Sequence, residues 1–100
     1  MDYKVILSRP ALEDLGEIVR HIAADNADAS MKVGSELLAL AESLDVLPWR
    51  GGSLRSRPEI RRLIRSPYAV IYRVSERERT VYVLRFWHTS RNPVEQFGGF

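Results

Sequence analysis

Two apolar runs separated by a charged turn dominate the second half of the chain. Residues 68–74 and 81–87 are rich in β-branched and aromatic side chains, and residues 76–79 between them are all charged. Such runs, joined by a short polar turn, predict an antiparallel β-hairpin. Residues 60–65 supply a third strand just before the hairpin, and residues 3–7 supply a short strand near the start. The three consecutive strands predict an antiparallel meander.

Between the first strand and the meander, apolar residues recur at three- and four-residue steps, which predicts two amphipathic helices. The first helix begins at Ser8, a residue type that caps helix N-termini, and ends near Asp25. The second is capped by Asp28 and closed by Pro48, which lacks a backbone donor. Because few residues separate the helices, we expect an antiparallel helical hairpin over residues 9–47.

The predicted order is therefore strand, helix, helix, strand, strand, strand. This is an α+β fold in which the helical hairpin packs on one face of an antiparallel sheet. The opposite face would carry alternating residues such as Arg73 and Arg85 and form a concave basic surface, and residues 49–59 would form a loop. One hundred residues support a single two-layer core, so we expect one domain over residues 1–91 and a weakly structured tail over residues 92–100.

The composition argues against several kinds of site. The chain has no cysteine, so it has neither disulfides nor thiolate metal ligands, and its two histidines form no metal-binding motif. We therefore expect no metal and no other cofactor. No window of about 18 apolar residues occurs, so no membrane-spanning helix is expected. The N-terminus lacks the apolar stretch of a signal peptide, which favours a cytoplasmic location.

The net charge of +2 conceals an uneven distribution. Residues 1–48 carry a net charge of −5, whereas residues 49–100 contain eleven arginines, four acidic residues and no lysine, a net charge of +7. Arginine makes planar contacts to carboxylates and phosphates and stacks on aromatic rings, so the second half suggests an anionic partner. A general preference for arginine over lysine in the genome would explain why the basic residues are arginines. It would not explain why they are concentrated in the second half of the chain.

Four segments and the helical hairpin occur in an order and spacing typical of a known family. The segments are Leu7-Ser8-Arg9-Pro10-Ala11-Leu12-Glu13-Asp14-Leu15, Ile60-Arg61-Arg62-Leu63, Tyr68-Ala69-Val70-Ile71-Tyr72-Arg73-Val74 and Val83-Leu84-Arg85-Phe86-Trp87-His88. Together they resemble the toxins of the RelE/ParE superfamily of type II toxin–antitoxin systems, also called plasmid stabilisation proteins. The resemblance covers nearly the whole chain. It implies a toxin that is neutralised by a cognate antitoxin.

The superfamily contains two mechanisms. RelE-like members are ribosome-dependent ribonucleases, which need acid–base groups and cations that stabilise the charge developing on the phosphate. In that branch an arginine follows the tyrosine that opens the strand corresponding to residues 68–74, and another basic residue follows the last strand. The matching residues here are Ala69 and Thr89. ParE-like members poison DNA gyrase by binding, and their last strand commonly ends in a histidine before small polar residues, as at His88. The resemblance therefore favours a ParE-like gyrase inhibitor, which is not an enzyme.

The alternative interpretation is a RelE-like endoribonuclease that acts on mRNA at the ribosome. In that case His88, Arg91 and Arg62 would be the catalytic residues. A histidine at the end of a strand more often packs or caps than catalyses. A third possibility is a chain that keeps the fold as an inactive interaction module.

The ParE-like interpretation predicts a surface for an acidic partner, such as the antitoxin, with aromatic anchors. The predicted partner-binding residues are Arg61, Arg65, Arg73, Arg85, Trp87 and Trp49. The same arginines also fit an ordinary solvent-facing sheet with aromatic side chains in the core. Glu13, Asp14 and Glu17 are interpreted as a solvated helix face.

Overall fold

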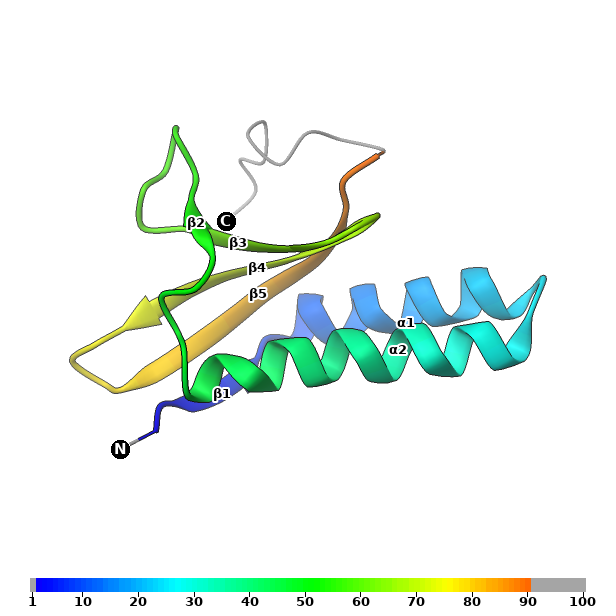
Figure 1. Ribbon diagram of the computed structural model, residues 1–100, viewed down its shortest axis with the longest axis horizontal. Helices are drawn as coiled ribbons and strands as arrows, with labels where there is room; N and C mark the ends of the chain where they lie inside the picture. The colour runs from blue at the N-terminus through cyan, green and yellow to red at the C-terminus, as the bar shows by residue number, and fades with distance from the viewer. Residues whose placement is uncertain (1, 91–100) are drawn as a thin grey trace.

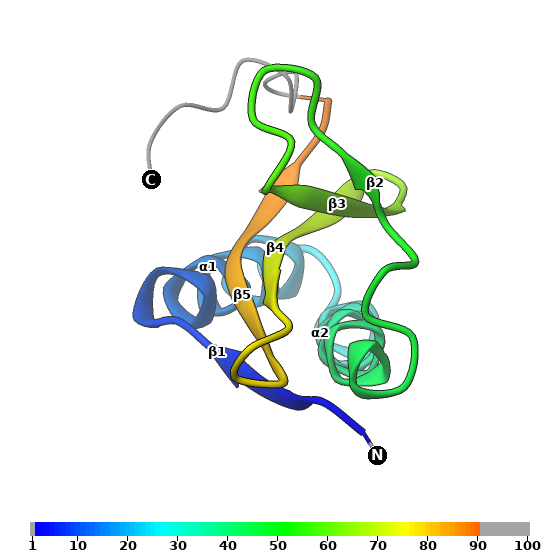
Figure 2. The same cartoon turned by 90° about the vertical axis from the view of Figure 1, so that its left-hand side faces the viewer.

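The computed structural model describes residues 2–90, which form two layers. The elements are β1 (Lys4–Leu7), α1 (Arg9–Ala23), α2 (Ala27–Glu42), the 3₁₀ turn η1 (Ser43–Asp45), β2 (Gly52–Ser53), β3 (Arg61–Arg65), β4 (Tyr68–Ser75) and β5 (Thr80–His88). The strands form one sheet in the order β1-β5-β4-β3-β2. The two helices lie side by side against the same face of the sheet (Figure 1 and Figure 2). The predicted α+β fold is confirmed.

The sheet is mixed rather than wholly antiparallel. β1 pairs in parallel with β5, with Lys4 opposite Thr80 and Leu7 opposite Val83. The other three strand pairs are antiparallel. The pairs of β4 with β3 and with β5 were predicted, whereas the pair of β2 with β3 was not, because its residues were predicted as a loop. A parallel pair requires a long connection, and the whole chain from α1 to β4 lies between β1 and β5. The direction of β1 is therefore set by packing, because no tight turn joins it to its neighbour.

Helix α1 begins where the sequence predicts. The hydroxyl of Ser8 accepts a hydrogen bond from the N–H of Ala11 at 3.2 Å, and Pro10 lies in the first turn. The same hydroxyl donates to the carbonyl of Leu84 at 2.9 Å, and the N–H of Ser8 donates to the carbonyl of Val83 at 2.9 Å. Ser8 therefore fastens the helix to β5 just beyond the end of β1.

Helix α2 differs from its predicted bounds at both ends. Its N-cap is Asn26, whose side chain accepts a hydrogen bond from the N–H of Ala29 at 3.0 Å, so the prediction of Asp28 as the cap was wrong. Asp28 already lies inside the first turn, where its backbone is helical and its side chain does not take the capping position. After Glu42 the chain tightens into η1, before the predicted stop at Pro48.

Apolar clusters cover both faces of the sheet. The larger lies between the sheet and the helices, and its buried members are Ala11, Leu37, Ala41, Leu44, Tyr68, Val70, Tyr72, Val81, Val83 and Phe86. The smaller joins Leu54 and Ile60 to Ala69 and Ile71 of β4, with Leu84 and Trp87 packed against it. The segment predicted as a loop, residues 49–59, therefore contributes β2 and the buried side chain of Leu54, and residues 68–72 of β4 are buried on both faces.

Candidate partner-binding surface

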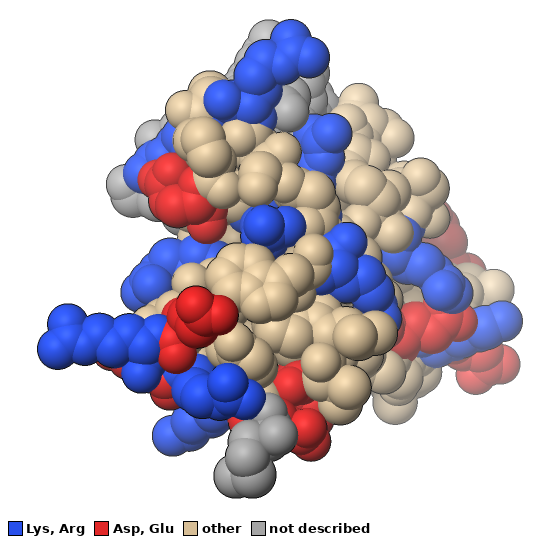
Figure 3. Space-filling model, turned by 60° about the vertical axis from the view of Figure 1, so that its left-hand side comes forward, with Lys and Arg blue, Asp and Glu red and all other residues tan. Residues whose placement is uncertain are grey.

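The predicted partner-binding arginines lie on two faces of the sheet. Arg73 is exposed on the face away from the helices, where its guanidinium carbon lies 4.3 Å from the centre of the Tyr82 ring. Arg61 and Arg65 share the helix side of β3 with Leu63, because alternate residues of a strand point to the same face. Lys and Arg side chains are spread among uncharged patches of the surface in Figure 3. The arginines that were predicted to form one basic surface are therefore divided between the two faces of the sheet.

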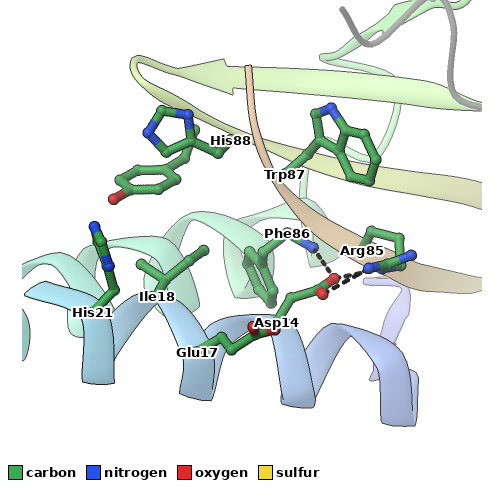
Figure 4. Close-up of a pocket in the computed structure, with 9 residues that line it drawn as sticks. Asp14, Glu17, Ile18, His21, Arg85, Phe86, Trp87 and His88 are labelled. Carbon is green, nitrogen blue, oxygen red and sulfur yellow. Dashed lines mark hydrogen bonds and ion pairs between the residues drawn. The ribbon is translucent and has the colours of Figure 1, made fainter. Parts of the chain in front are cut away.

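Arg85 is held by an acidic residue of α1. Its Nε and Nη2 donate to Oδ2 and Oδ1 of Asp14 at 2.5 and 2.8 Å (Figure 4). The N–H of Phe86 donates to Oδ2 of the same carboxylate at 3.2 Å. The hydrogen bond that Arg85 donates to Asp14 raises the pKa of the guanidinium. The prediction that Asp14 only faces solvent was wrong, and Arg85 does not join Arg73 in a basic face, because its charge is committed to this pair.

The position of Asp14 follows from the short first strand. β1 ends at Leu7, opposite Val83, so the outer edge of β5 has no neighbouring strand beyond that residue. Backbone groups at an uncovered edge need other partners. The hydroxyl of Ser8 donates a hydrogen bond to the carbonyl of Leu84, and the carboxylate of Asp14 accepts one from the N–H of Phe86. The start of α1 thus continues the edge pairing that β1 begins.

A cleft of about 250 Å³ lies between α1 and the end of β5. Its lining residues are Asp14, Glu17, Ile18, His21, Tyr68, Arg85, Phe86, Trp87 and His88 (Figure 4). The imidazole of His88 meets the Tyr68 ring edge-on, with 5.2 Å between centroids and 86° between planes. Its Nδ1 is buried and has no hydrogen-bond partner within residues 2–90. A catalytic histidine is normally oriented by such a partner, so this geometry fits packing better than proton transfer.

The two positions that distinguish a ribonuclease offer no cation. Ala69 is fully buried in the smaller apolar cluster. The hydroxyl of Thr89 donates to the carbonyl of Pro67 at 3.0 Å, and its N–H donates to the same oxygen at 2.9 Å. These two hydrogen bonds therefore close the turn between β3 and β4. Neither side chain can stabilise charge on a phosphate.

The structure places the described residues of the alternative catalytic set on different sides of the sheet. Arg62 lies opposite Ile71, whose side chain is in the smaller cluster away from the helices. His88 lies opposite Tyr68, whose side chain is in the larger cluster beside the helices. Arg91 lies outside the described residues. The side chains of Arg62 and His88 consequently face opposite sides of the sheet.

Across residues 2–90, no three His, Cys, Asp or Glu side chains are grouped so that they could bind a metal ion. None of the helices described in this range is long and apolar enough to cross a membrane.

The family model of the ParE toxin of the type II toxin–antitoxin system parDE matches residues 5–93. This chain belongs to the ParE toxin family. The match covers both helices and the strands of the described fold, apart from Lys4 at the start of β1.

Solved toxin structures share the fold of this ParE-family chain. The chromosomal ParDE system from P. aeruginosa matches with a TM-score of 0.72 and 21% identity, over 86% of this chain and 95% of that chain. The RelBE2 toxin–antitoxin complex from Mycobacterium tuberculosis matches with a TM-score of 0.71 and 23% identity, over 88% and 99%. The isolated E. coli RelE toxin matches with a TM-score of 0.55 and 18% identity, over 92% and 89%. Comparison with curated protein sequences gave no match.

In this ParE-family chain the remaining predicted partner-binding residues gather around β3. Nη1 of Arg61 donates to the carbonyls of Gly51 and Trp49 at 2.5 and 3.3 Å. Its guanidinium carbon also lies 5.0 Å from the centre of the Trp49 ring, which is half exposed. Arg65 forms an ion pair with Glu36 of α2. The structure therefore brings Arg61 and Trp49 into direct contact and places Arg65 on the same side of the strand.

Three residues that shape this surface were missed by the sequence analysis. Leu54 and Ile60 are the only apolar residues between Arg50 and Arg61, a signal that could have identified them as anchors of the segment. Asp14 gives no comparable signal, because its partner is 71 residues away in the chain.

Proposed function

We propose that this ParE-family toxin acts by binding DNA gyrase and inhibiting it, and that a cognate antitoxin neutralises it. The observation that carries the proposal is the match to the ParE toxin model over residues 5–93. The solved structures of similar fold include a ParDE system and a toxin–antitoxin complex, which supports an antitoxin as the partner. A binding inhibitor requires no catalytic group, which agrees with the buried Ala69 and the hydrogen-bonded Thr89.

The alternative is a RelE-like endoribonuclease that cleaves mRNA on the ribosome. The fold of the isolated E. coli RelE toxin supports this candidate at the level of architecture. Phosphodiester cleavage also needs charge stabilisation at the reacting phosphate and an oriented acid or base. The opposite orientations of Arg62 and His88 speak against such a site in this chain.

The proposed inhibitor would use arginines and aromatic side chains that are at least partly exposed as contact residues. On the open face these are Arg73 and Trp87, and on the helix side of β3 they are Arg61, Arg65 and Trp49. Basic residues accelerate association with an acidic partner, and aromatic and arginine side chains carry much of the energy at protein interfaces. Arg85 would contribute indirectly, by keeping the end of β5 in place against α1.

The decisive experiment compares the two activities with one protein preparation. Purified protein is added to gyrase supercoiling and DNA cleavage reactions, and in parallel to ribosomes that carry a bound mRNA. We expect gyrase to be inhibited and the mRNA to stay intact, and we expect His88→Ala to retain the inhibition. Cleavage of the mRNA without an effect on gyrase would instead establish the ribonuclease.

A charge reversal on the open face tests the proposed contact residues. Arg73→Glu should weaken gyrase inhibition by about tenfold or more, because it replaces an attractive charge with a repulsive one in the interface. Arg77→Glu is the matched control, since Arg77 is also exposed but lies in the turn between β4 and β5. The concentrations that give half-maximal inhibition are compared. Equal inhibition by both variants would remove Arg73 from the contact surface.

A further inference from the structure

The cleft between α1 and the end of β5, here called the α1–β5 cleft, has an acidic wall and an aromatic wall. The acidic side chains come from α1 and the aromatic ones from the strands (Figure 4). The residues of the strand wall are Tyr68, Arg85, Phe86, Trp87 and His88. The volume of about 250 Å³ lies below the range of about 300–1,000 Å³ that is typical of pockets for whole ligands. The α1–β5 cleft therefore suits a single side chain.

The lining of the α1–β5 cleft contains two carboxylates but only one guanidinium. Asp14 is paired with Arg85, from which it accepts two hydrogen bonds. Glu17 follows three residues later on the same side of α1, is exposed, and forms no hydrogen bond or ion pair within residues 2–90. Arg20, the next cation on this helix, extends back along α1 towards Gly16. The carboxylate of Glu17 is therefore available to a ligand.

The α1–β5 cleft already contains one guanidinium, and its contacts show what the lining can recognise. Arg85 donates to the Asp14 carboxylate through Nε and Nη2, and its guanidinium carbon lies 5.6 Å from the centre of the Trp87 ring. The planar fork of arginine matches the two oxygens of a carboxylate, and the faces of aromatic rings attract its charge. Lysine offers a point charge without this fork. Glu17 and the aromatic wall provide the same two kinds of contact for a second guanidinium.

The strand wall also holds a polar atom that lacks a hydrogen-bond partner. Nδ1 of His88 is buried, and no group within residues 2–90 bonds to it. Buried polar atoms are nearly always satisfied, so an exception in the wall of a cleft points to a group that binds there. A guanidinium has five N–H donors, so it can bind a carboxylate through two of them and donate to an imidazole nitrogen through another.

We propose that the α1–β5 cleft is a binding site for an arginine side chain presented by a protein partner. The guanidinium would form two hydrogen bonds with the Glu17 carboxylate and stack against the aromatic side chains of the strand wall. A free arginine molecule also carries an α-carboxylate, and Arg85, which is paired with Asp14, is the only Lys or Arg in the described lining. An arginine residue within a chain has no such carboxylate, which favours a protein as the source. The site does not depend on whether gyrase is the target.

The test compares two small probes that differ in charge. N-acetylarginine methylamide imitates an arginine residue in a chain, and N-acetylcitrulline methylamide has nearly the same shape without the positive charge. In the full-length chain, Trp49→Phe leaves Trp87, which lines the cleft, as the only tryptophan. At constant ionic strength, the arginine probe should change the emission of Trp87 saturably and bind about tenfold or more tightly than the citrulline probe. Equal binding of the two probes, or no saturable change with the arginine probe, would overturn the site.

A substitution at Glu17 tests which carboxylate binds the probe. Glu17→Gln should reduce the affinity for the arginine probe by about fivefold or more, because the amide keeps the shape of the side chain but loses its charge. Glu42→Gln is the matched control, since Glu42 is also exposed but lies at the end of α2 and does not line the cleft. The control should retain its affinity within about twofold, because solvent screens distant charges. An equal loss in both variants would overturn the role of Glu17.

Free arginine distinguishes the two sources of the guanidinium. It should bind no more tightly than N-acetylarginine methylamide, because its α-carboxylate finds no additional cation in the described lining. Clearly tighter binding of free arginine would overturn a protein partner as the source and identify the amino acid itself as the ligand.

Discussion

At the residue scale, Gly51 and Tyr72 show how closely the chain is packed where the linker meets the sheet. The N–H of Gly51 donates to the hydroxyl of the buried Tyr72 at 2.8 Å. An added Cβ at Gly51 would lie 2.4 Å from the carbonyl oxygen of Arg62. Glycine is therefore required at this position by the close approach of two backbone segments.

Gly51→Ala should destabilise the fold by roughly 1–3 kcal/mol, because the new methyl group collides with backbone atoms that cannot rotate away. Gly52→Ala is the control, since an added Cβ at Gly52 meets nothing within 4 Å. The free energies of unfolding are measured by urea denaturation. A loss of similar size in both variants would contradict the steric explanation.

Tyr72 should make the stability depend on alkaline pH. Burial is the main cause that raises its pKa above the ordinary value of 10.0. The unfolded chain then loses the phenol proton before the native chain does. The contribution of the Tyr72 phenol to the free energy of unfolding is complete below about pH 10 and is lost as pH rises through the higher native pKa. Tyr72→Phe should show a smaller loss of stability than the wild type between about pH 9 and 11, and identical slopes would refute the assignment.

At the element scale, α1 is attached to β5 by polar contacts as well as by the apolar cluster. Ser8 and Asp14 are the residues that make these contacts, and both pair with backbone groups that β1 leaves uncovered. The ion pair between Asp14 and Arg85 is partly shielded, with side-chain exposures of 12% and 32%. Solvent therefore screens it less than an ordinary surface pair.

A double-mutant cycle with Asp14→Ala and Arg85→Ala should give a coupling energy of about 0.5–3 kcal/mol in urea denaturation. The two side chains form a bidentate contact, so each single substitution already removes the interaction. Glu13→Ala on the exposed side of α1 should cost little. Strictly additive effects would mean that the pair contributes no net stability.

At the scale of the whole molecule, the uneven charge distribution serves the fold in part. The acidic first half forms the helices, and the arginine-rich second half forms most of the sheet. Asp14 and Glu36 of the helices pair with Arg85 and Arg65 of the strands. Some of the arginines that suggested an external anionic partner therefore pair with carboxylates of the protein itself. Arg73, whose guanidinium stacks on Tyr82, stays a candidate for an external partner.

Residues 1–91 should fold as an independent domain. The described range, residues 2–90, contains both apolar clusters and every strand of the sheet. A chain that ends at Arg91 should therefore unfold cooperatively, with a midpoint within about 4 °C of the full chain, a difference of under about 1 kcal/mol. Thermal unfolding followed by circular dichroism measures this. A broad transition or a larger decrease would place part of the stability beyond residue 91.

The sequence by itself determined the elements whose signals are local. The β-branched runs of β4 and β5, the cap at Ser8 and the apolar spacing of both helices each depend on residues within a few positions of one another. The mixed sheet, the pairing of Asp14 with Arg85 and the face of the sheet that Leu54 covers were decided only by the tertiary structure. These features join residues far apart in the chain, and an isolated acidic or apolar side chain carries no information about which distant edge or face it will meet.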